Sequence, residues 1–472
     1  TPEEIDFRAP EIPGSAGMTR EIVVASTEPP REYENQEVRS LGGGVFVLTG
    51  RDVELHGEVA ADAENIIEST GDGGSGGSIF IEGLSIKLGD NASLTAVGSP
   101  AGGLESYYGW GGDGGHVSLI SGYIEGNPDS AVNVSGGRGD RNAYNPGGSG
   151  ATGTLYFYEN LLDIEDPEYL IIRNKRELSE YENLRAREVS VDYEGFDNIA
   201  VRNCPVRIVT GVGSEYIKVG GLIVFDGTVA LNGRLRSNSI RLEADSMIRP
   251  LVRDHYSEYP SAKYTNVSIG ADLVTIDNSS SINATGFGVD SSIGTPASHG
   301  GYGGYAVELG VPPSELFGDF RTPHMPGIGY SNDVRGGGMV DLDVTELHLH
   351  GRIEASGEGN GPASGGSINI TTDLITFGEK SGISADGSET SAVGGGGGRV
   401  SLSYSESSVD DSLVQEYITA YGGKSYDAQG GAGSIYIENS SSGSKILIVE
   451  NYSKVYKTEY NRYSSSPWAS CT

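Results

Sequence analysis

The sequence predicts an all-β protein that folds as a parallel β-helix, also called a β-solenoid, with three short strands in each rung. Three observations lead to this fold class. Apolar residues recur in pairs with a period of two, the pairs come in sets of three, and the sets return along the chain in constant register. A period of two places both side chains of a pair on one face of a β-strand.

The stretch 79–98 holds one complete set and defines the template. Its apolar positions are Ile79 and Ile81, Ile86 and Leu88, and Leu94 and Ala96, with Gly98 closing the set. Each pair predicts one short strand, and the intervals between pairs predict two tight corners. The set returns at 267–286 and 368–387, at 117–136 with Gly126 in place of one apolar residue, and more loosely from Val45, Val340 and Val400.

These copies are expected to stack, because a unit of three short strands cannot bury its apolar stripe alone. An antiparallel sandwich also has short strands and frequent turns, but the constant register of whole three-strand sets favours the solenoid. Glycine contributes 73 of the 472 residues and clusters between the sets. Glycine-rich loops, such as 98–117, 136–155 and 387–400, are therefore expected to leave from one corner of the rung.

The chain is expected to contain two related solenoid modules, because residues 53–57 (VELHG) resemble 347–351 (LHLHG) and 170–174 (LIIRN) resemble 447–451 (LIVEN). The predicted organisation is an extended arm or cap at 1–40, a first module at 41–175, a middle region with further rungs and long loop excursions at 176–335, a second module at 336–460 and a tail at 461–472. The ends of a solenoid expose unpaired strand edges, which need a cover or a partner molecule.

The formal net charge of −33 excludes a general nucleic-acid binder, which needs a basic face. It also disfavours binding to anionic membrane surfaces. No apolar run approaches the roughly 20 residues of a membrane-spanning helix. An acidic surface fits a protein that works outside the cell, and solubility through self-repulsion is the alternative explanation.

The two cysteines, Cys204 and Cys471, are too few for a disulfide scaffold. They are a candidate disulfide that would tie the C-terminal tail to the middle of the chain. Each could instead bond a neighbouring molecule, and the sequence leaves both pairings open.

A polysaccharide-cleaving β-helix is the main enzymatic alternative, and it would need two or three carboxylates stacked on neighbouring rungs. Outward positions of the template instead carry mostly small hydroxyl and amide residues, among them Ser118, Ser268, Asn369 and Ser401. No acidic ladder emerges from the template. We therefore expect no enzymatic activity, no catalytic residues and no cofactor.

Two short pairs are weak candidates for metal binding. His348 and His350 lie two positions apart and share one face of a strand, but a third ligand of the kind zinc requires is not evident. Asp341 and Asp343 also project together, and calcium is the ion that such carboxylates would take. Solvated surface pairs are the favoured interpretation, and no metal site is predicted.

Acceptor motifs for N-glycosylation, Asn-x-Ser/Thr, recur along the chain. They occur at Asn91, Asn133, Asn266, Asn278, Asn283, Asn369, Asn439 and Asn451. An occupied acceptor must reach the surface of a secreted protein, and the motifs inside the template avoid its inward positions. The alternative is that Asn, Ser and Thr are simply frequent outward residues. Attached glycans are the favoured interpretation.

Aromatic residues among the glycines of the predicted loops form a candidate contact surface. They are Tyr107, Tyr108, Trp110, Tyr144 and Tyr426. Tyr and Trp contribute strongly to interface energetics, and solenoids bind partners along extended faces. The alternative, given equal weight, is that these rings only cover the adjoining sheet.

Recurrent strand starts combine glycine with alternating apolar residues: GSIFI at 77–81, GSINI at 366–370, GRVSL at 398–402 and GSIYI at 433–437. By these motifs the sequence resembles the glycine-rich parallel β-helix proteins that microbes secrete or display on their surfaces. The resemblance implies an extracellular structural role and names no substrate. We expect a rigid, acidic, glycosylated β-solenoid that self-assembles, as a homo-oligomer or polymer, into a filament, sheath or surface layer. The alternative function is a glycan-binding or polysaccharide-cleaving β-helix, such as a tailspike or lyase.

Overall fold

The computed structural model describes the chain in thirteen segments. These are residues 42–64, 72–101, 110–139, 148–159, 168–174, 186–191, 195–210, 216–251, 266–289, 297–304, 314–330, 334–390 and 393–451. Several sequence predictions lie outside the described residues: the arm at 1–40, the tail at 461–472, Tyr107, Tyr108, Tyr144 and Cys471.

The chain divides into two compact units. The first contains Thr1–Val189, Phe196–Val206 and Phe225–Gly227, and the second contains Ser190–Gly195, Arg207–Val224 and Thr228–Thr472. Strands β10 (Arg187–Val191) and β12 (Pro205–Thr210) divide between the two units.

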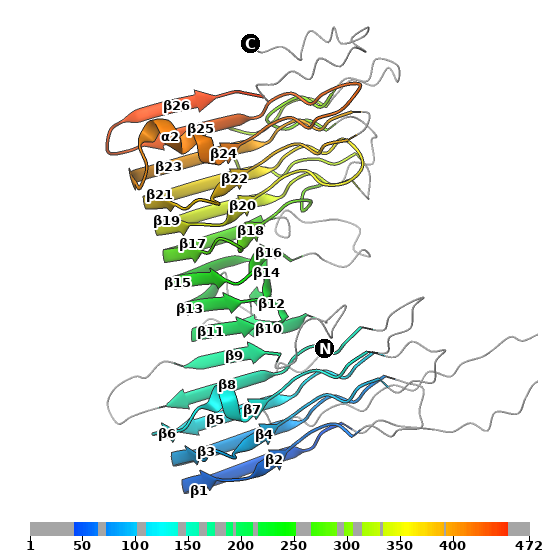
Figure 1. Cartoon of the computed structure of the whole chain (residues 1–472), viewed down its shortest axis with the longest axis vertical. Helices are drawn as coiled ribbons and strands as arrows, with labels where there is room; N and C mark the ends of the chain where they lie inside the picture. Colours follow the sequence, from blue (N-terminus) through cyan, green and yellow to red (C-terminus); the bar gives the residue numbers. More distant parts are fainter. Residues whose placement is uncertain are drawn as a thin grey trace, which may run out of the picture. The chain divides into compact units, whose positions relative to one another are not determined.

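Mostly parallel strands build the first unit (Figure 1). Its main sheet has the order β1-β3-β5-β8-β9-β11, with β6 beside β3, and a small sheet has the order β2-β4-β7. The strands are β1 (Val45–Leu55), β2 (Glu58–Ala60), β3 (Ser78–Leu88), β4 (Ser93–Thr95), β5 (His116–Ser121), β6 (Ile124–Glu125), β7 (Val132–Asn133), β8 (Thr154–Glu159), β9 (Tyr169–Arg173) and β11 (Phe196–Arg202). A one-turn helix, α1 (Pro128–Ala131), precedes β7.

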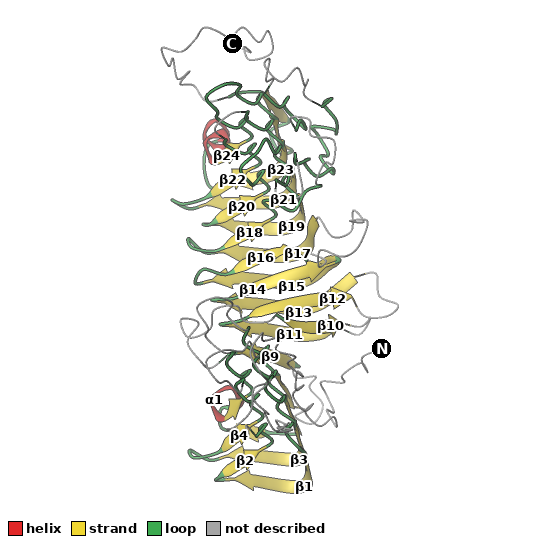
Figure 2. Cartoon of the chain, turned by 90° about the vertical axis from the view of Figure 1, so that its right-hand side faces the viewer, coloured by secondary structure: helices red, strands yellow, loops and turns green. Residues whose placement is uncertain are grey.

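The second unit has two sheets. Figure 2 shows the even-numbered strands from β14 to β22 lying beside the odd-numbered strands from β15 to β21. One sheet has the order β13-β15-β17-β19-β21-β23-β25-β26, and the other runs through β14-β16-β18-β20-β22-β24. The strands of the first of these sheets are β13 (Tyr216–Phe225), β15 (Arg234–Glu243), β17 (Asn266–Ile276), β19 (Met339–Leu349), β21 (Ser367–Phe377), β23 (Arg399–Ser407), β25 (Ser434–Asn439) and β26 (Ser444–Ile448). The strands of the second are β14 (Thr228–Asn232), β16 (Met247–Pro250), β18 (Ser281–Asn283), β20 (Arg352–Glu354), β22 (Gly382–Ser384) and β24 (Ile418–Thr419). A short helix, α2 (Asp411–Val414), and a 3-10 turn (Gln415–Tyr417) precede β24.

Equivalent apolar residues of successive copies pair side by side and are buried. In the second unit the column runs Val267, Val340, Ile368, Val400 and Ile435, each opposite the next on a parallel strand. All five side chains are buried. The prediction of an all-β protein with parallel strands is therefore confirmed, and the alternative antiparallel sandwich is wrong.

The boundaries of the strands differ from the template. The two pairs 79–81 and 86–88 were expected to form separate strands, but both lie in the single 11-residue strand β3. Strands β1, β17, β19 and β21 merge the equivalent pairs in the same way. The backbone stays extended through the predicted corner, where Gly83 pairs with Gly50. Only in the copy at 117–136 do β5 and β6 remain separate.

Among the strands that the structure describes, each unit contains one reversal of strand direction, and the two reversals have the same register. Strand β9 runs antiparallel to β8, with Leu155 opposite Ile171. Strand β26 runs antiparallel to β25, with Ile435 opposite Ile448. Because Leu155 and Ile435 start equivalent copies, the resemblance between 170–174 and 447–451 corresponds to an equivalence in the fold.

The glycine-rich segments form a closely packed layer in each unit, which we call the glycine layer. It comprises 72–77, 96–101, 110–115, 134–139 and 148–153 in the first unit, and 284–288, 334–338, 355–366, 385–390, 393–398 and 420–433 in the second. One hydrogen bond recurs: the N–H of the glycine before a long strand donates to the alanine carbonyl that follows a short strand. Gly115 donates to Ala96 and Gly366 to Ala355, each at 2.7 Å.

Glycine is required in this layer because backbones touch. A Cβ added to Gly115 would lie 1.9 Å from the carbonyl oxygen of Gly77, and one added to Gly366 would lie 1.9 Å from that of Gly338. These distances leave no space for a side chain, which is the close approach that only glycine permits.

Candidate functional site

Acidic side chains connect neighbouring segments of the chain where the short strands lead into the glycine layer. Asp62 accepts hydrogen bonds from the Val97 amide at 2.6 Å and the Thr95 hydroxyl at 2.9 Å. Asp386 does the same in the second unit, where it accepts from the Tyr421 amide at 2.6 Å and the Thr419 hydroxyl at 3.0 Å. These carboxylates therefore have a structural role, because they hold neighbouring segments together by hydrogen bonds. Burial raises the pKa of Asp386 despite these hydrogen bonds.

The predicted aromatic contact surface is described at two of its residues. The Trp110 ring lies against Gly148, since a Cβ added to that glycine would fall 1.9 Å from the ring. The Trp110 amide donates to Asp72 at 2.8 Å. Tyr426, in contrast, is 83% exposed. Trp110 thus covers the glycine layer, and Tyr426 is available to a partner.

The weak metal candidates have other contacts. Asp341 accepts a hydrogen bond from the side-chain amide of Asn369 at 2.9 Å. Asp343 lies 3.4 Å from the guanidinium of Arg234. His348 lies 3.5 Å from the Glu346 carboxylate. Within the described segments no group of three or more His, Cys, Asp or Glu side chains is arranged to hold a metal ion.

The acceptor asparagines differ sharply in accessibility. Asn91 and Asn278 are exposed in turns, and Asn133 and Asn266 are half-buried. Asn283, Asn369 and Asn451 are half-buried and donate from the side-chain amide nitrogen, to Glu354, Asp341 and the Gly430 carbonyl respectively. Asn439 is buried, and its amide nitrogen donates to both carboxylate oxygens of Asp411, at 3.0 and 3.1 Å.

Cys204 lies in the core of the first unit and its thiol donates to the Ile172 carbonyl at 3.4 Å. Burial raises the pKa of this thiol to about 12. The candidate pairing with Cys471 stays a prediction, because Cys471 lies outside the described residues.

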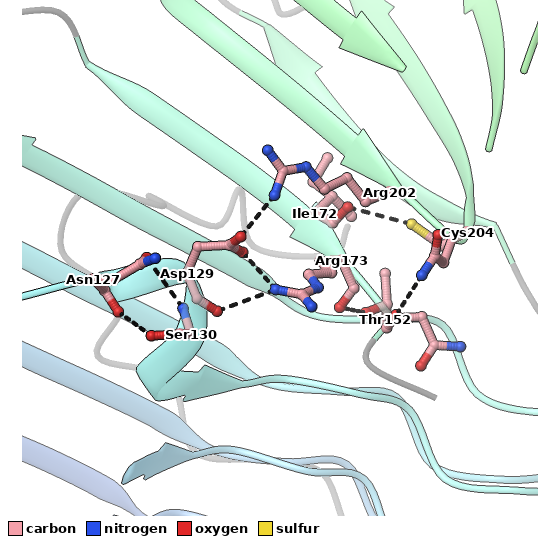
Figure 3. Close-up of polar contacts among 10 residues, drawn as sticks. Asn127, Asp129, Ser130, Thr152, Ile172, Arg173, Arg202 and Cys204 are labelled. Atoms are coloured by element: carbon pink, nitrogen blue, oxygen red, sulfur yellow. Dashed lines mark hydrogen bonds and ion pairs between the residues drawn. The ribbon is translucent and has the colours of Figure 1, made fainter. Parts of the chain in front are cut away.

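A charged cluster that sequence reasoning missed joins α1 to strands β9 and β11 (Figure 3). Asp129 lies 3.1 Å from Arg173, at the end of β9, and 2.6 Å from Arg202, at the end of β11. Asn127 caps the helix by accepting from the Ser130 amide at 3.3 Å. The spacing of Asp129 and its two partners in the sequence carries no recognisable signal.

A buried histidine-arginine pair was also missed. The His116 ring lies 2.8 Å from the Arg187 guanidinium through Nε2 and 2.6 Å from the Thr154 hydroxyl through Nδ1. Since a guanidinium can only donate, Nε2 accepts and the ring is neutral. Burial and the positive charge of Arg187 hold the pKa of His116 well below its usual value.

The two terminal strands carry apolar residues that are only partly covered. Within the described residues β1 has a single neighbour, β3, and β26 has a single neighbour, β25. Phe46 and Leu48 of β1 are half-buried, and Leu447 at β26 is 51% exposed. The terminal strands β1 and β26 are therefore the strongest candidates for a functional contact.

Comparison with known proteins gives no match to a family model, to a curated protein or to a solved structure. Among the described residues, no helix is long and apolar enough to cross a membrane.

Proposed function

We propose that the chain is an extracellular structural protein: an acidic, glycosylated β-solenoid that assembles with copies of itself into a filament, sheath or surface layer. The observation that carries the proposal is the pairing of successive copies in constant register from β15 to β25. Repeats that contact only their neighbours form stacks with extended faces.

The glycine layer supports a solenoid path and a rigid body. Where an alanine follows the short strand, the glycine that precedes the next long strand lies beside that alanine, as Gly115 does beside Ala96 and Gly366 beside Ala355. The recurrent glycine-to-alanine hydrogen bond marks this arrangement in both units. Close-packed backbones without side chains leave little room for internal movement.

The net charge of −33 and the exposed acceptors Asn91 and Asn278 support a surface in contact with the extracellular medium. Strong negative charge keeps separate molecules apart, so assembly must come from specific contacts. The partly covered terminal strands, β1 in the first unit and β26 in the second, can provide such contacts, because an unpaired strand edge is a template for another chain.

Negative-stain electron microscopy and sedimentation velocity of the purified chain at neutral pH, over a hundredfold range of concentration, test the proposal. We expect ordered assemblies that grow with concentration. Dispersed monomers at high concentration would overturn it. Release of reducing ends from acidic polysaccharides by those monomers would favour the polysaccharide-cleaving alternative instead.

A further inference from the structure

The two reversals of strand direction, at β9 and at β26, are equivalent in register but not in burial. Leu170 and Ile172 of β9 are both 0% exposed. Their equivalents, Leu447 and Val449, are both 51% exposed. The equivalence is fixed by the preceding strand, because Ile171 faces Leu155 as Ile448 faces Ile435.

The difference between the reversals lies in the next strand. In the first unit β11 pairs in parallel along the other edge of β9 and sets Ile199 opposite Leu170 and Val201 opposite Ile172. Ile199 and Val201 are themselves almost fully buried. At β26 no described strand takes the place of β11.

Strand β1 has the features required of a strand that pairs with the free edge of β26, as β11 pairs with β9. It lies at the end of its sheet, and its inward residues Phe46 and Leu48 pack on the core while remaining half-buried. The residues opposite them on β3, Ile79 and Ile81, are 0% exposed. Phe46 and Leu48 are separated by one residue, as Ile199 and Val201 are.

We propose that β1 of a second copy of this chain pairs in parallel with β26 of the first copy, as β11 pairs with β9. The register follows from the first unit: Phe46 lies opposite Leu447, Val47 opposite Ile448 and Leu48 opposite Val449. The contact joins two different surfaces, so it does not close a dimer and continues from copy to copy. Backbone pairing gives affinity and the apolar pairs fix the register.

This inference rests on the proposed function, and cysteine cross-linking separates the two. In a Cys471→Ser background, which leaves only the buried Cys204, Val47→Cys and Ile448→Cys chains are prepared separately and mixed under mild oxidation. Paired positions on neighbouring strands lie within the reach of a disulfide. We expect a cross-linked heterodimer from this mixture.

The matched control replaces Ile448→Cys by Ile446→Cys. Residue 446 lies on the same face of β26 but two positions away, about 6.6 Å along the strand, so the mixture with Val47→Cys should give at least tenfold less cross-link. Equal cross-linking of 446 and 448 would overturn the proposed register.

Association itself is measured with Leu447→Asp, for which we expect at least tenfold weaker assembly. The control is Leu413→Asp, because Leu413 is also a partly exposed leucine, 41% exposed, but lies in α2 and not in β26. Ordered assemblies without the 47–448 cross-link would overturn this inference and leave the proposed function intact. Absence of any assembly would overturn both. Hydrogen exchange protection along β26 that does not depend on concentration would identify another segment of the same chain as the cover, and would also overturn the inference.

Discussion

The carboxylate of Asp129 lies 2.6 Å from the guanidinium of Arg202, although 73 residues separate them in the sequence. Asp129 stands in α1, and Arg202 ends β11, the strand that follows the reversal in the first unit. The same carboxylate reaches Arg173 at the end of β9. One acidic side chain therefore connects the ends of β9 and β11. The proposed contact between copies has the same register as these two strands.

Replacing Asp129 by alanine should lower the free energy of unfolding by about 1–2 kcal/mol, because two partly exposed ion pairs are lost and both arginines keep their charge. Urea denaturation monitored by circular dichroism measures the change. Asp90→Ala, on an exposed turn, is the control and should have little effect. Equal stability of the two variants would show that the Asp129 cluster does not contribute.

Gly366→Ala should destabilise the second unit by about 3 kcal/mol, since the added methyl group would meet the Gly338 carbonyl and force the backbones apart. Gly382→Ala is the matched control in the same copy, because a Cβ at Gly382 meets nothing within 4 Å. Thermal unfolding by calorimetry compares the two. A similar melting temperature for both variants would contradict the close packing of the glycine layer.

Acidification should destabilise the protein through its buried histidines. Burial lowers the pKa of His299 to about 4, even though the ring also donates to the Gly365 carbonyl. The unfolded chain takes up this proton near pH 6.5 and the folded chain only near pH 4. Stability from this group is complete above about pH 6.5 and falls by about 3 kcal/mol as the pH drops to about 4.

Denaturant unfolding at pH 7, 5.5 and 4.5 measures this dependence. His299→Gln should weaken it, whereas His324→Gln, which changes an exposed histidine in the same unit, should leave it as in the native chain. An unchanged pH dependence in His299→Gln would rule out this histidine as a source.

Glycan occupancy should follow the accessibility of the amide nitrogen to which the sugar is attached. Peptide mass spectrometry of the chain from a glycosylating host should find Asn91 and Asn278 occupied and Asn439 unoccupied, because the Asn439 nitrogen is buried against Asp411. Occupancy at Asn439 equal to that at Asn91 would mean that the sugar is attached before this part of the chain folds.

The pattern of apolar residues is sufficient to predict the parallel stacking and its register. The period of two and the constant spacing of the sets predict which side chains line up, and Val267, Val340 and Ile368 do lie opposite one another. Hydrophobic periodicity carries this information because burial on one face of a strand leaves a trace at every second residue.

Features that depend on contacts between distant segments emerge only from the folded chain. The sequence predicts that the glycine clusters form corners and loops, but it does not show that close backbone-to-backbone packing requires glycine at positions such as Gly115. The corner predicted between Ile81 and Ile86 is absent because the neighbouring strand keeps the backbone extended. The direction of β26 and the pairing of Asp129 with Arg202 leave no periodic trace in the sequence, since both depend on contacts between segments that come together only in the folded chain.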